Sequence, residues 1–346
     1  MIKRGIPVVT IEAKDNYEFG YKLGKALKEN IQLRIKKNKE IYKKRAYKPH
    51  DFPTLIKKAK KFIPVVKKYF PHLLIEAKAM AEGAEVPFEE LFVLICDEEI
   101  VNFEVLRCTS VAVRTTDNSI LLGHNEDWIP EYRKNGLFLV KGKIKNNKFL
   151  ALGYVGNLVG SACGINADKI AYSDNSLDTD KFVYGIPRSF HLRALLDSKN
   201  PKEALKILNK KGSIISNTLF VFSNKIIVDV EEHWENHEVF SSEECFVHTN
   251  HTLNKKYWTK PQSKDKSSMM RYNRAKELVL SQKKFNVNVL KKILRDHKGT
   301  ICDHFDKKHP LKSAPTIASI IMNPYKKWMM LGHGNPCKGK YKKYSL

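Results

Sequence analysis

Hydrophobic residues recur with two different periods along this chain, and the changes of period divide it into blocks. In the first third, apolar residues lie at helical spacing among lysines, as in Leu55 to Ile63, which predicts amphipathic helices with a solvated basic face. From residue 108 to residue 175 the pattern becomes short β-branched or alternating runs between glycine turns, which predicts strands. Later segments predict two helices and a closing hairpin, at 271–280, 289–294, and 316–322 with 328–331. Strand blocks flanked by helix blocks predict a layered α+β domain.

Local signals place several helix ends and turns. Asp15-Asn16-Tyr17-Glu18 has the pattern of a capping box, in which Asp15 accepts an unpaired N–H and Glu18 reaches back. Pro87 predicts a helix start, and so does Asn200-Pro201-Lys202-Glu203, with Gly212 as the expected C-terminal stop of that second helix. Residues 220–222 and 226–228 predict a β-hairpin.

Composition limits the class of protein. With 346 residues and 42% hydrophobic residues, the chain can form one large domain or two small ones. Met1 to Gly5 leads into a strand-like stretch without an apolar core, so no signal peptide is expected. No apolar run reaches the ~18 residues of a membrane-spanning helix. We therefore expect a cytoplasmic protein without a membrane partner.

The six cysteines are scattered, which favours reduced thiols, one of them a candidate nucleophile. Cys163, Cys245 and Cys337 carry no specific signal and are interpreted as structural. The net charge of +25 raises the question of nucleic-acid binding. The lysines are spread over helix faces and no nucleic-acid motif is present, so we expect only non-specific adsorption to polyanions. Such a field would also favour an anionic substrate, including a coenzyme A thioester.

Cys108 begins the run Cys108-Thr109-Ser110-Val111-Ala112-Val113, which predicts a strand. A turn at 116–119 and a returning strand follow, and Asn125-Glu126-Asp127-Trp128 ends the hairpin. A cysteine at the start of a strand, with an amide and a carboxylate at the far end of the hairpin, suits a nucleophile that becomes a new chain N-terminus. The alternative is a buried apolar cysteine beside a polar turn.

Cys108-Thr109-Ser110 with Asn125-x-Asp127-Trp128 resembles the penicillin acyltransferase family, the acyl-coenzyme A: isopenicillin N acyltransferases and their relatives. Further stretches match in order: Gly20-x-x-x-Gly24, Ala81-Glu82-Gly83-Ala84, Gly156-x-x-x-Gly160, Gly164-Ile165-Asn166, Asn175-Ser176-Leu177, Pro187, Arg193-x-Leu195-Leu196, Glu203-Ala204, Ser216-Asn217, Val230-Glu231, His248-Thr249-Asn250-His251 and Gly334-x-Pro336-Cys337. The resemblance implies a four-layer αββα sandwich of N-terminal-nucleophile hydrolase type. It also implies autocatalytic cleavage before Cys108, with residues 1–107 and 108–346 staying associated as one domain.

Two positions depart from the family pattern. Arg107 stands where the fungal penicillin enzyme has a glycine before its cysteine. Asp303, in Ile301-Cys302-Asp303, stands where many relatives have an arginine that is thought to serve the active site. Arg271 is a candidate replacement for that positive charge and for substrate binding, and the alternative is an arginine on a helix surface.

The chemistry follows from the cysteine. A free thiol near pKa ~8.5 is mostly protonated at neutral pH, whereas an exposed α-amino group titrates near ~7.7–8 and can take its proton. A backbone amide cannot act as this base, so the Arg107–Cys108 bond must be cut first, by attack of Cys108 on the Arg107 carbonyl. Asp127 is the candidate to orient the new amine, or else a turn-capping residue.

Asn250 is a candidate oxyanion donor, with a loop asparagine as the alternative. His248 is a possible substrate-binding residue, and His248 or His251 would be the base if the site were a conventional Cys–His pair. Asn125 is interpreted as a turn amide and Trp128 as an apolar wall. The segment Gly156 to Gly160 lacks the ending of a phosphate loop and is interpreted as a tight turn near the substrate cleft.

Cys302, His304 and His309 invite a zinc interpretation, which we discount because they lie in one short loop without a second ligand pair. No metal and no cofactor are therefore expected. The sequence predicts an autoprocessed N-terminal-cysteine amidohydrolase or acyltransferase, which cleaves a small non-peptide acyl amide or thioester through an S-acyl-cysteine. The alternative is a non-catalytic ligand-binding protein on the same fold.

Overall fold

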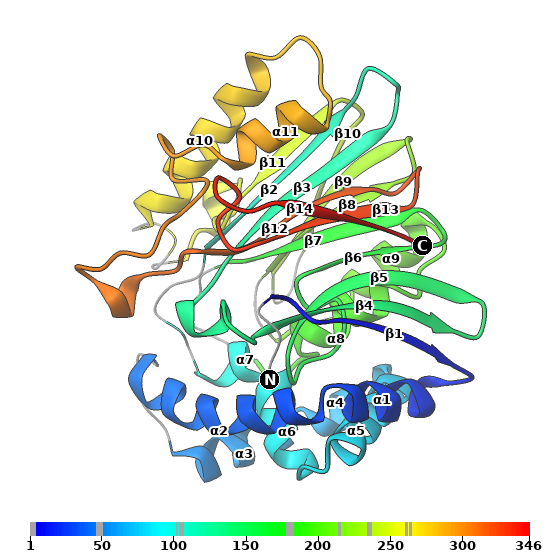
Figure 1. Cartoon of the computed structure of the whole chain (residues 1–346). Helices are drawn as coiled ribbons and strands as arrows, with labels where there is room; N and C mark the ends of the chain where they lie inside the picture. Colours follow the sequence, from blue (N-terminus) through cyan, green and yellow to red (C-terminus); the bar gives the residue numbers. More distant parts are fainter. Residues whose placement is uncertain are drawn as a thin grey trace.

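Two β-sheets lie face to face at the centre of the molecule, and helices cover the outer side of each sheet (Figure 1). The computed structural model describes residues 5–45, 51–101, 103, 107–177, 183–213, 216–233, 237–259, 262 and 265–346. The layers follow the order helices, sheet, sheet, helices. The predicted four-layer αββα sandwich of the α+β class is confirmed.

The large sheet has eight strands within the described residues, in the order β1-β4-β5-β6-β7-β8-β9-β10. Their bounds are β1 (Val8–Ala13), β4 (Leu137–Ile144), β5 (Asn147–Tyr154), β6 (Cys163–Asn166), β7 (Ile170–Ser176), β8 (Ser216–Phe222), β9 (Ile226–Glu232) and β10 (His237–Ser242). β1 pairs with β4 in parallel, whereas the other neighbours are antiparallel. Because β1 precedes Cys108 and β4 follows it, the two predicted segments share one sheet.

The small sheet carries Cys108. Its order in the described residues is β11-β2-β3-β12-β13-β14. The bounds are β2 (Arg107–Arg114), β3 (Ile120–Asp127), β11 (Cys245–His248), β12 (Thr316–Asn323), β13 (Trp328–His333) and β14 (Tyr341–Ser345). Side chains alternate between its two faces. Val111 and Val113 pack with Leu290 under the outer helices, whereas Ala112 belongs to the core between the sheets.

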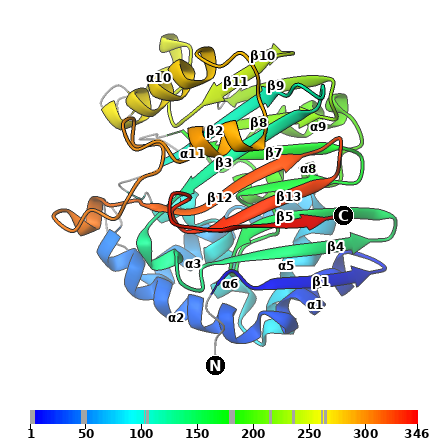
Figure 2. The same ribbon diagram turned by 45° about the horizontal axis from the view of Figure 1, so that its top comes forward.

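Helices before Cys108, together with α8 and α9, lie on the side of the large sheet, and α10 and α11 cover the small sheet (Figure 2). The bounds are α1 (Asn16–Ala26), α2 (Lys28–Arg45), α3 (Phe52–Lys60), α4 (Ile63–Tyr69), α5 (Pro71–Ala84), α6 (Phe88–Ile95), α7 (Asp97–Val101), α8 (Arg188–Leu195), α9 (Pro201–Leu208), α10 (Lys266–Leu280) and α11 (Val287–Leu294). α10 therefore lies over the strand that bears Cys108.

Most local predictions match the structure. Asp15 caps α1 by accepting the Glu18 N–H at 2.8 Å, and the Glu18 carboxylate accepts the Lys14 N–H, one residue before the expected position. Asn200 caps α9 through the Glu203 N–H at 3.0 Å. The prediction for Gly212 is wrong, because α9 ends at Leu208 and Gly212 instead forms an isolated bridge with Ile186.

No helix in the described part of the chain combines the length and the apolar character needed to cross a membrane. The residues at 1–4, on which part of the signal-peptide expectation rests, lie outside the described residues.

Candidate active site

Cys108 is the second residue of β2, and its thiol lies on the face of the small sheet that looks toward the large sheet. It is 5% exposed. The antiparallel register places it opposite Glu126 of β3. The thiol lies 3.7 Å from Glu126 Oε1 and can donate a hydrogen bond to it. A carboxylate is therefore the nearest acceptor for the thiol proton.

The surroundings of Cys108 favour the protonated thiol. Burial raises the pKa of this thiol well above its ordinary value, and the carboxylates of Glu126 and Asp127 raise it further. A thiol with a raised pKa is a poor nucleophile without a base. In this environment, Cys108 needs a group that takes its proton at the moment of attack.

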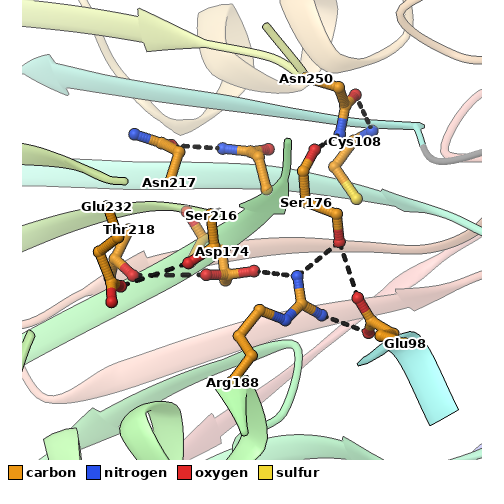
Figure 3. Close-up of polar contacts among 12 residues, drawn as sticks. Glu98, Cys108, Asp174, Ser176, Arg188, Ser216, Asn217, Thr218, Glu232 and Asn250 are labelled. Carbon is orange, nitrogen blue, oxygen red and sulfur yellow. Dashed lines mark hydrogen bonds and ion pairs between the residues drawn. The ribbon is translucent and has the colours of Figure 1, made fainter. Parts of the chain in front are cut away.

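Three hydrogen bonds hold the backbone nitrogen of Cys108 and the Asn250 side chain beside it, and Figure 3 shows those with Cys108 and Ser176. The Cys108 N–H donates to Asn250 Oδ1 at 2.7 Å, and Asn250 Nδ2 donates to the Ser176 carbonyl at 2.8 Å. Arg271 Nη2 also donates to Asn250 Oδ1, at 2.9 Å. Because its oxygen accepts two N–H groups and its nitrogen faces a carbonyl, the orientation of the amide is determined. Asn250 presents an acceptor to Cys108, whereas the expected oxyanion role requires a donor.

Arg271 of α10 is fully buried beside Cys108, which excludes the alternative of a helix-surface arginine. Its Nη1 donates to the Cys108 carbonyl and, at 3.3 Å, to Thr109 Oγ1. Burial lowers the pKa of this guanidinium, although Asp127 and Asp265 oppose the shift. The structure thus brings a positive charge to the nucleophile from a helix that lies far along the chain.

Asp127 ends β3 opposite Arg107, in a strand and not in a turn. It is fully buried, and within the described part of the chain no donor lies in good hydrogen-bond geometry to either of its carboxylate oxygens, although Thr316 is close enough to lower its pKa. Burial raises the pKa of Asp127 well above its ordinary value, and Arg271 only partly opposes this effect. A buried carboxylate without a well-formed hydrogen bond is costly, so this position calls for a donor or a positive charge.

The two departures from the family pattern contact each other. Arg107 Nη1 lies 2.6 Å from Asp303 Oδ2, and both side chains are partly buried. Asp303 therefore does not supply the family's positive charge but neutralises the arginine that precedes Cys108.

The structure does not bring the predicted histidines to Cys108. Both ring nitrogens of His248 are occupied, by the Thr249 carbonyl and by Glu231, each at 2.8 Å. His251 contacts Ser268 at 2.7 Å, and burial lowers the pKa of His251 to about 4. Neither contact set places His248 or His251 against the thiol, whereas His124 of β3 lies within 4.8 Å of it.

Glu126 was missed by the sequence analysis, where it was the variable position of Asn125-x-Asp127. Its Oε1 also accepts the Tyr154 hydroxyl, and its Oε2 contacts His124 Nε2 at 2.9 Å. The signal that could have found it is the hairpin register, because Arg114 pairs with Ile120 and each step back along β2 leads to the pair of Cys108 with Glu126. Asn125, expected in a turn, lies in β3 and ties this strand to the carbonyls of Leu294 and Ile301.

A small cavity adjoins the thiol. Its free space, about 10 Å³, is close to that of a single water molecule. It is lined by Glu98, Arg107, Cys108, Glu126, Trp128, Tyr154, Ser161, Asp174, Ser176 and Arg188. A second cavity shares Glu98, Trp128 and Tyr154 and is also lined by Leu94, Asp97, Tyr132, Val155 and Asn157. Residues 155–161 thus border both cavities, as expected of a turn near the cleft, and Trp128 is the expected apolar wall.

Arg188 and Glu98 are further cavity residues that the sequence analysis missed. Arg188, in the first turn of α8, contacts Glu98, Ser176 and Asp174 (Figure 3). Its positive charge is therefore matched by two carboxylates, whereas Glu126 in the same cavity contacts His124 and Tyr154.

Comparisons with known proteins give the family of this chain. A sequence model of the acyl-coenzyme A:6-aminopenicillanic acid acyl-transferase family matches residues 113–338. The β-alanyl-dopamine/carcinine hydrolase of Drosophila melanogaster is 30% identical over 167 residues, covering 42% of this chain and 43% of that protein. This chain thus matches less than half the length of that relative.

Among solved structures, penicillin V acylase from Agrobacterium tumefaciens is similar at 12% identity and a TM-score of 0.46, over 69% of this chain and 86% of that one. A conjugated bile acid hydrolase from Clostridium perfringens is similar at 12% identity and a TM-score of 0.45, over 69% of this chain and 97% of that one. The family match spans most of the chain, from β2 to the loop before β14. The chain therefore belongs to the acyl-coenzyme A:6-aminopenicillanic acid acyl-transferase family, as the sequence motifs predicted.

Proposed function

We propose that this protein is an amidohydrolase that matures by cutting its own Arg107–Cys108 bond and then uses Cys108 as an N-terminal nucleophile. The observation that carries this proposal is the setting of the Cys108 nitrogen, which Asn250 Oδ1 holds at 2.7 Å. Asp127, buried and without a well-formed hydrogen bond among the described residues, lies at the same end of the hairpin. An α-ammonium group formed at Cys108 would give this carboxylate its missing positive partner.

Maturation begins when Cys108 Sγ attacks the Arg107 carbonyl carbon. Glu126 is placed to accept the thiol proton, since it is the carboxylate 3.7 Å from the sulfur. The C–N bond breaks as the Cys108 nitrogen takes a proton, which leaves Arg107 as a thioester on the sulfur. Water hydrolyses this thioester, releasing the Arg107 carboxylate and the free thiol of Cys108.

In turnover, the free amine of Cys108 replaces the backbone amide and serves as the base for the thiol. The thiol attacks the carbonyl of a substrate amide, the amine product leaves with a proton, and water resolves the S-acyl-cysteine. Asn250 and Arg271 act as positioning residues, because they hold the Cys108 nitrogen and carbonyl on either side of the reacting sulfur. Acyl transfer differs only in the acceptor, an amine in place of water.

The side chains that line the cavity favour a small substrate with a cationic acyl group, although the cavity, with free space for about one water molecule, must widen to admit it. Its aromatic walls suit an organic cation, and three carboxylates (Glu98, Glu126 and Asp174) line it against two arginines. The relative from Drosophila is named for hydrolysis of β-alanyl-dopamine, whose acyl group carries an amine. The same carboxylates count against the coenzyme A thioester that the overall charge favoured, because that ligand brings negative charge to the cavity.

The first test is the intact mass of the purified protein. We expect two chains, 1–107 and 108–346, that remain together because β1 lies in the large sheet beside β4. Cys108→Ala should give one uncut, folded chain. Efficient cleavage after Arg107 in that variant would assign the cut to an external protease. A wild-type chain that is uncut, and whose Cys108 reacts with a thiol-directed electrophile no faster than Cys163, would favour the non-catalytic ligand-binding alternative.

The second test concerns the amine and the substrate. Segments 1–107 and 108–346 produced together should be active when Cys108 is the first residue, and one extra residue before it should abolish activity. Three matched amides of dopamine distinguish the acyl group: β-alanyl (cationic), propionyl (neutral) and succinyl (anionic). We expect the β-alanyl amide to have the highest kcat/KM. In the same two-segment protein, Glu126→Gln should lower the ratio of kcat/KM for the β-alanyl amide to kcat/KM for the propionyl amide. Equal rates for all three amides would refute the assignment of the acyl group and leave maturation untouched.

A further inference from the structure

Two histidines and two cysteines meet outside the active site, between the loop that follows α11 and the loop before β14. They are His297, Cys302, His304 and Cys337, and their potential ligand atoms all lie within 4.8 Å of one another. His304 Nε2 lies 3.2 Å from His297 Nε2, 3.4 Å from Cys337 Sγ and 3.8 Å from Cys302 Sγ. Two imidazole nitrogens and two cysteine sulfurs therefore lie close enough together to bind one metal ion.

These spacings are those of a tetrahedral zinc site. With Zn–N near 2.0–2.1 Å and Zn–S near 2.3 Å, a regular tetrahedron places two nitrogens about 3.4 Å apart and a nitrogen and a sulfur about 3.6 Å apart. The three distances from His304 Nε2 to the other ligand atoms each lie within about 0.2 Å of these values. A tetrahedral set of two sulfurs and two nitrogens is typical of zinc or of an iron–sulfur centre, and four ligand atoms within 4.8 Å of one another suit a single ion.

The surroundings hold the ligands in place. Asn335 Nδ2 donates to Cys302 Sγ at 3.8 Å and to the Asp303 carbonyl at 2.5 Å, and Arg295 Nε donates to the Pro336 carbonyl at 2.9 Å. Two of these hydrogen bonds, from Asn335 to Asp303 and from Arg295 to Pro336, join the ligand-bearing loops without using a ligand side chain. Cys302 is buried, whereas His297 is exposed, so a metal ion has a path from solvent.

We infer that His297, Cys302, His304 and Cys337 bind one structural zinc ion. All six cysteines are free thiols, and a Cys302–Cys337 disulfide would leave the convergence of the two imidazoles unexplained. Two thiolates also neutralise the charge of Zn²⁺, which suits a site in a strongly basic protein. Four protein ligands leave no open position, so the ion has a structural and not a catalytic role.

Zinc was discounted from the sequence because no second ligand pair was seen beside Cys302 and His304. The fold brings such a pair to them. His297 and Cys337 are that pair, and Cys337 comes from the far end of the chain, where it was interpreted as structural. His309, the other residue considered, contacts Asp306 instead, at 2.9 Å.

The ion would act on the active site through Asp303, which lies between two ligands in the sequence. The zinc-bound loop would fix the backbone of Asp303, whose carboxylate holds Arg107 at the bond to be cut. The cluster shares no residue with the cavity at Cys108, so zinc binding and the proposed maturation can be tested separately.

The test uses the full-length chain with Cys108→Ala, in which maturation cannot affect the result. We expect about one zinc per chain by elemental analysis. Replacement by cobalt should give the visible bands of tetrahedral, thiolate-bound Co²⁺. Cys302→Ser and Cys337→Ser should lose both signals, and Cys245→Ser, a half-buried thiol outside the cluster, should keep them. Asn335→Ala should weaken zinc binding by about 10- to 100-fold in competition with a chelator.

Cobalt titration of the unmutated cluster decides the matter even if the serine variants fail to fold. No zinc in protein purified without chelators, together with no thiolate–cobalt bands on titration, would overturn the inference. So would an intact mass that lacks two hydrogens and a peptide map that joins Cys302 to Cys337, since those thiols would then be a disulfide. In the chain that keeps Cys108, loss of zinc together with normal cleavage after Arg107 would limit the role of the ion to stability.

Discussion

Asp127→Asn should stabilise the uncut chain but impair the mature enzyme. In the uncut chain, Asp127 is a buried carboxylate without a well-formed hydrogen bond in the described structure, and burial raises its pKa. The folded chain therefore binds a proton that the unfolded chain releases above an ordinary Asp pKa of ~3.9. Stability falls as pH rises through this window, by about 1.4 kcal/mol for each pH unit until the raised pKa is reached. Asparagine is neutral and removes this loss.

The assay is chemical denaturation of the uncut Cys108→Ala chain, with and without Asp127→Asn, at pH 5 and pH 8. Near pH 5, about one pH unit above the ordinary Asp value, this linkage already makes the asparagine variant more stable by about 1–2 kcal/mol in the free energy of unfolding. At pH 8 we expect the advantage of the asparagine variant to be larger, by about 1.4 kcal/mol for each further pH unit up to the raised pKa of Asp127.

Asp117→Asn is the matched control. Asp117 is half-exposed at a turn, and its hydrogen bonds with Lys326, Thr115 and Ser119 lower its pKa. A lowered pKa stabilises the folded chain above the ordinary Asp value, and this contribution is lost as pH falls. Asp117→Asn should therefore weaken the chain slightly at pH 8, the opposite sign to Asp127→Asn, by less than about 1 kcal/mol.

In the mature enzyme the same Asp127→Asn change should be harmful. The carboxylate then has the Cys108 ammonium as its partner, and a hydrogen bond to a charged group contributes about 1.5–3 kcal/mol, so turnover should fall about 10- to 100-fold. Destabilisation of the uncut chain by the same amount at both pH values would refute this reasoning. Asp127 would then be ionised and well paired before cleavage, and the new amine would not be its missing partner.

Three further predictions concern the surroundings of Cys108. Asn250→Ala should block cleavage, as measured by intact mass. It should also lower the free energy of unfolding by about 2–4 kcal/mol, because Cys108, Arg271 and Ser176 each lose a buried hydrogen-bond partner. An unchanged free energy of unfolding would show that these hydrogen bonds do not stabilise the fold. Arg271→Met should stop turnover and weaken folding for the same reason, and normal turnover would remove Arg271 from the site. A double-mutant cycle of Arg107→Ala and Asp303→Ala in the uncut chain should give a coupling of about 1 kcal/mol, whereas additive effects would show that the ion pair contributes nothing.

The expected cost of Asn250→Ala shows where the sequence analysis fell short. Asn250 was expected in a loop near solvent, where its loss costs about 1 kcal/mol. The structure buries it completely between Cys108 and Ser176, so truncation leaves several groups unpaired at once.

Much of the framework around Cys108 was determined by the sequence itself. The caps at Asp15 and Asn200 and the hairpin that starts at Cys108 depend on residues within a few positions of one another, so local hydrogen bonding and side-chain alternation suffice to predict them. The four layers were implied by the family resemblance and not by local patterns, since its motifs lie within helices, such as Gly20 and Gly24 of α1, as well as in strands and turns.

The partners of the nucleophile were decided by the tertiary structure. Arg271 is 163 residues from Cys108, Asp303 is 196 residues from Arg107, and Cys337 is 33 residues from His304. No local pattern distinguishes a buried arginine on α10 from an arginine on a helix surface, since both fit the same helical period. The packing of α10 against the small sheet buries Arg271. Because a buried guanidinium is costly without hydrogen bonds, it donates to the Cys108 carbonyl and to Asn250 Oδ1.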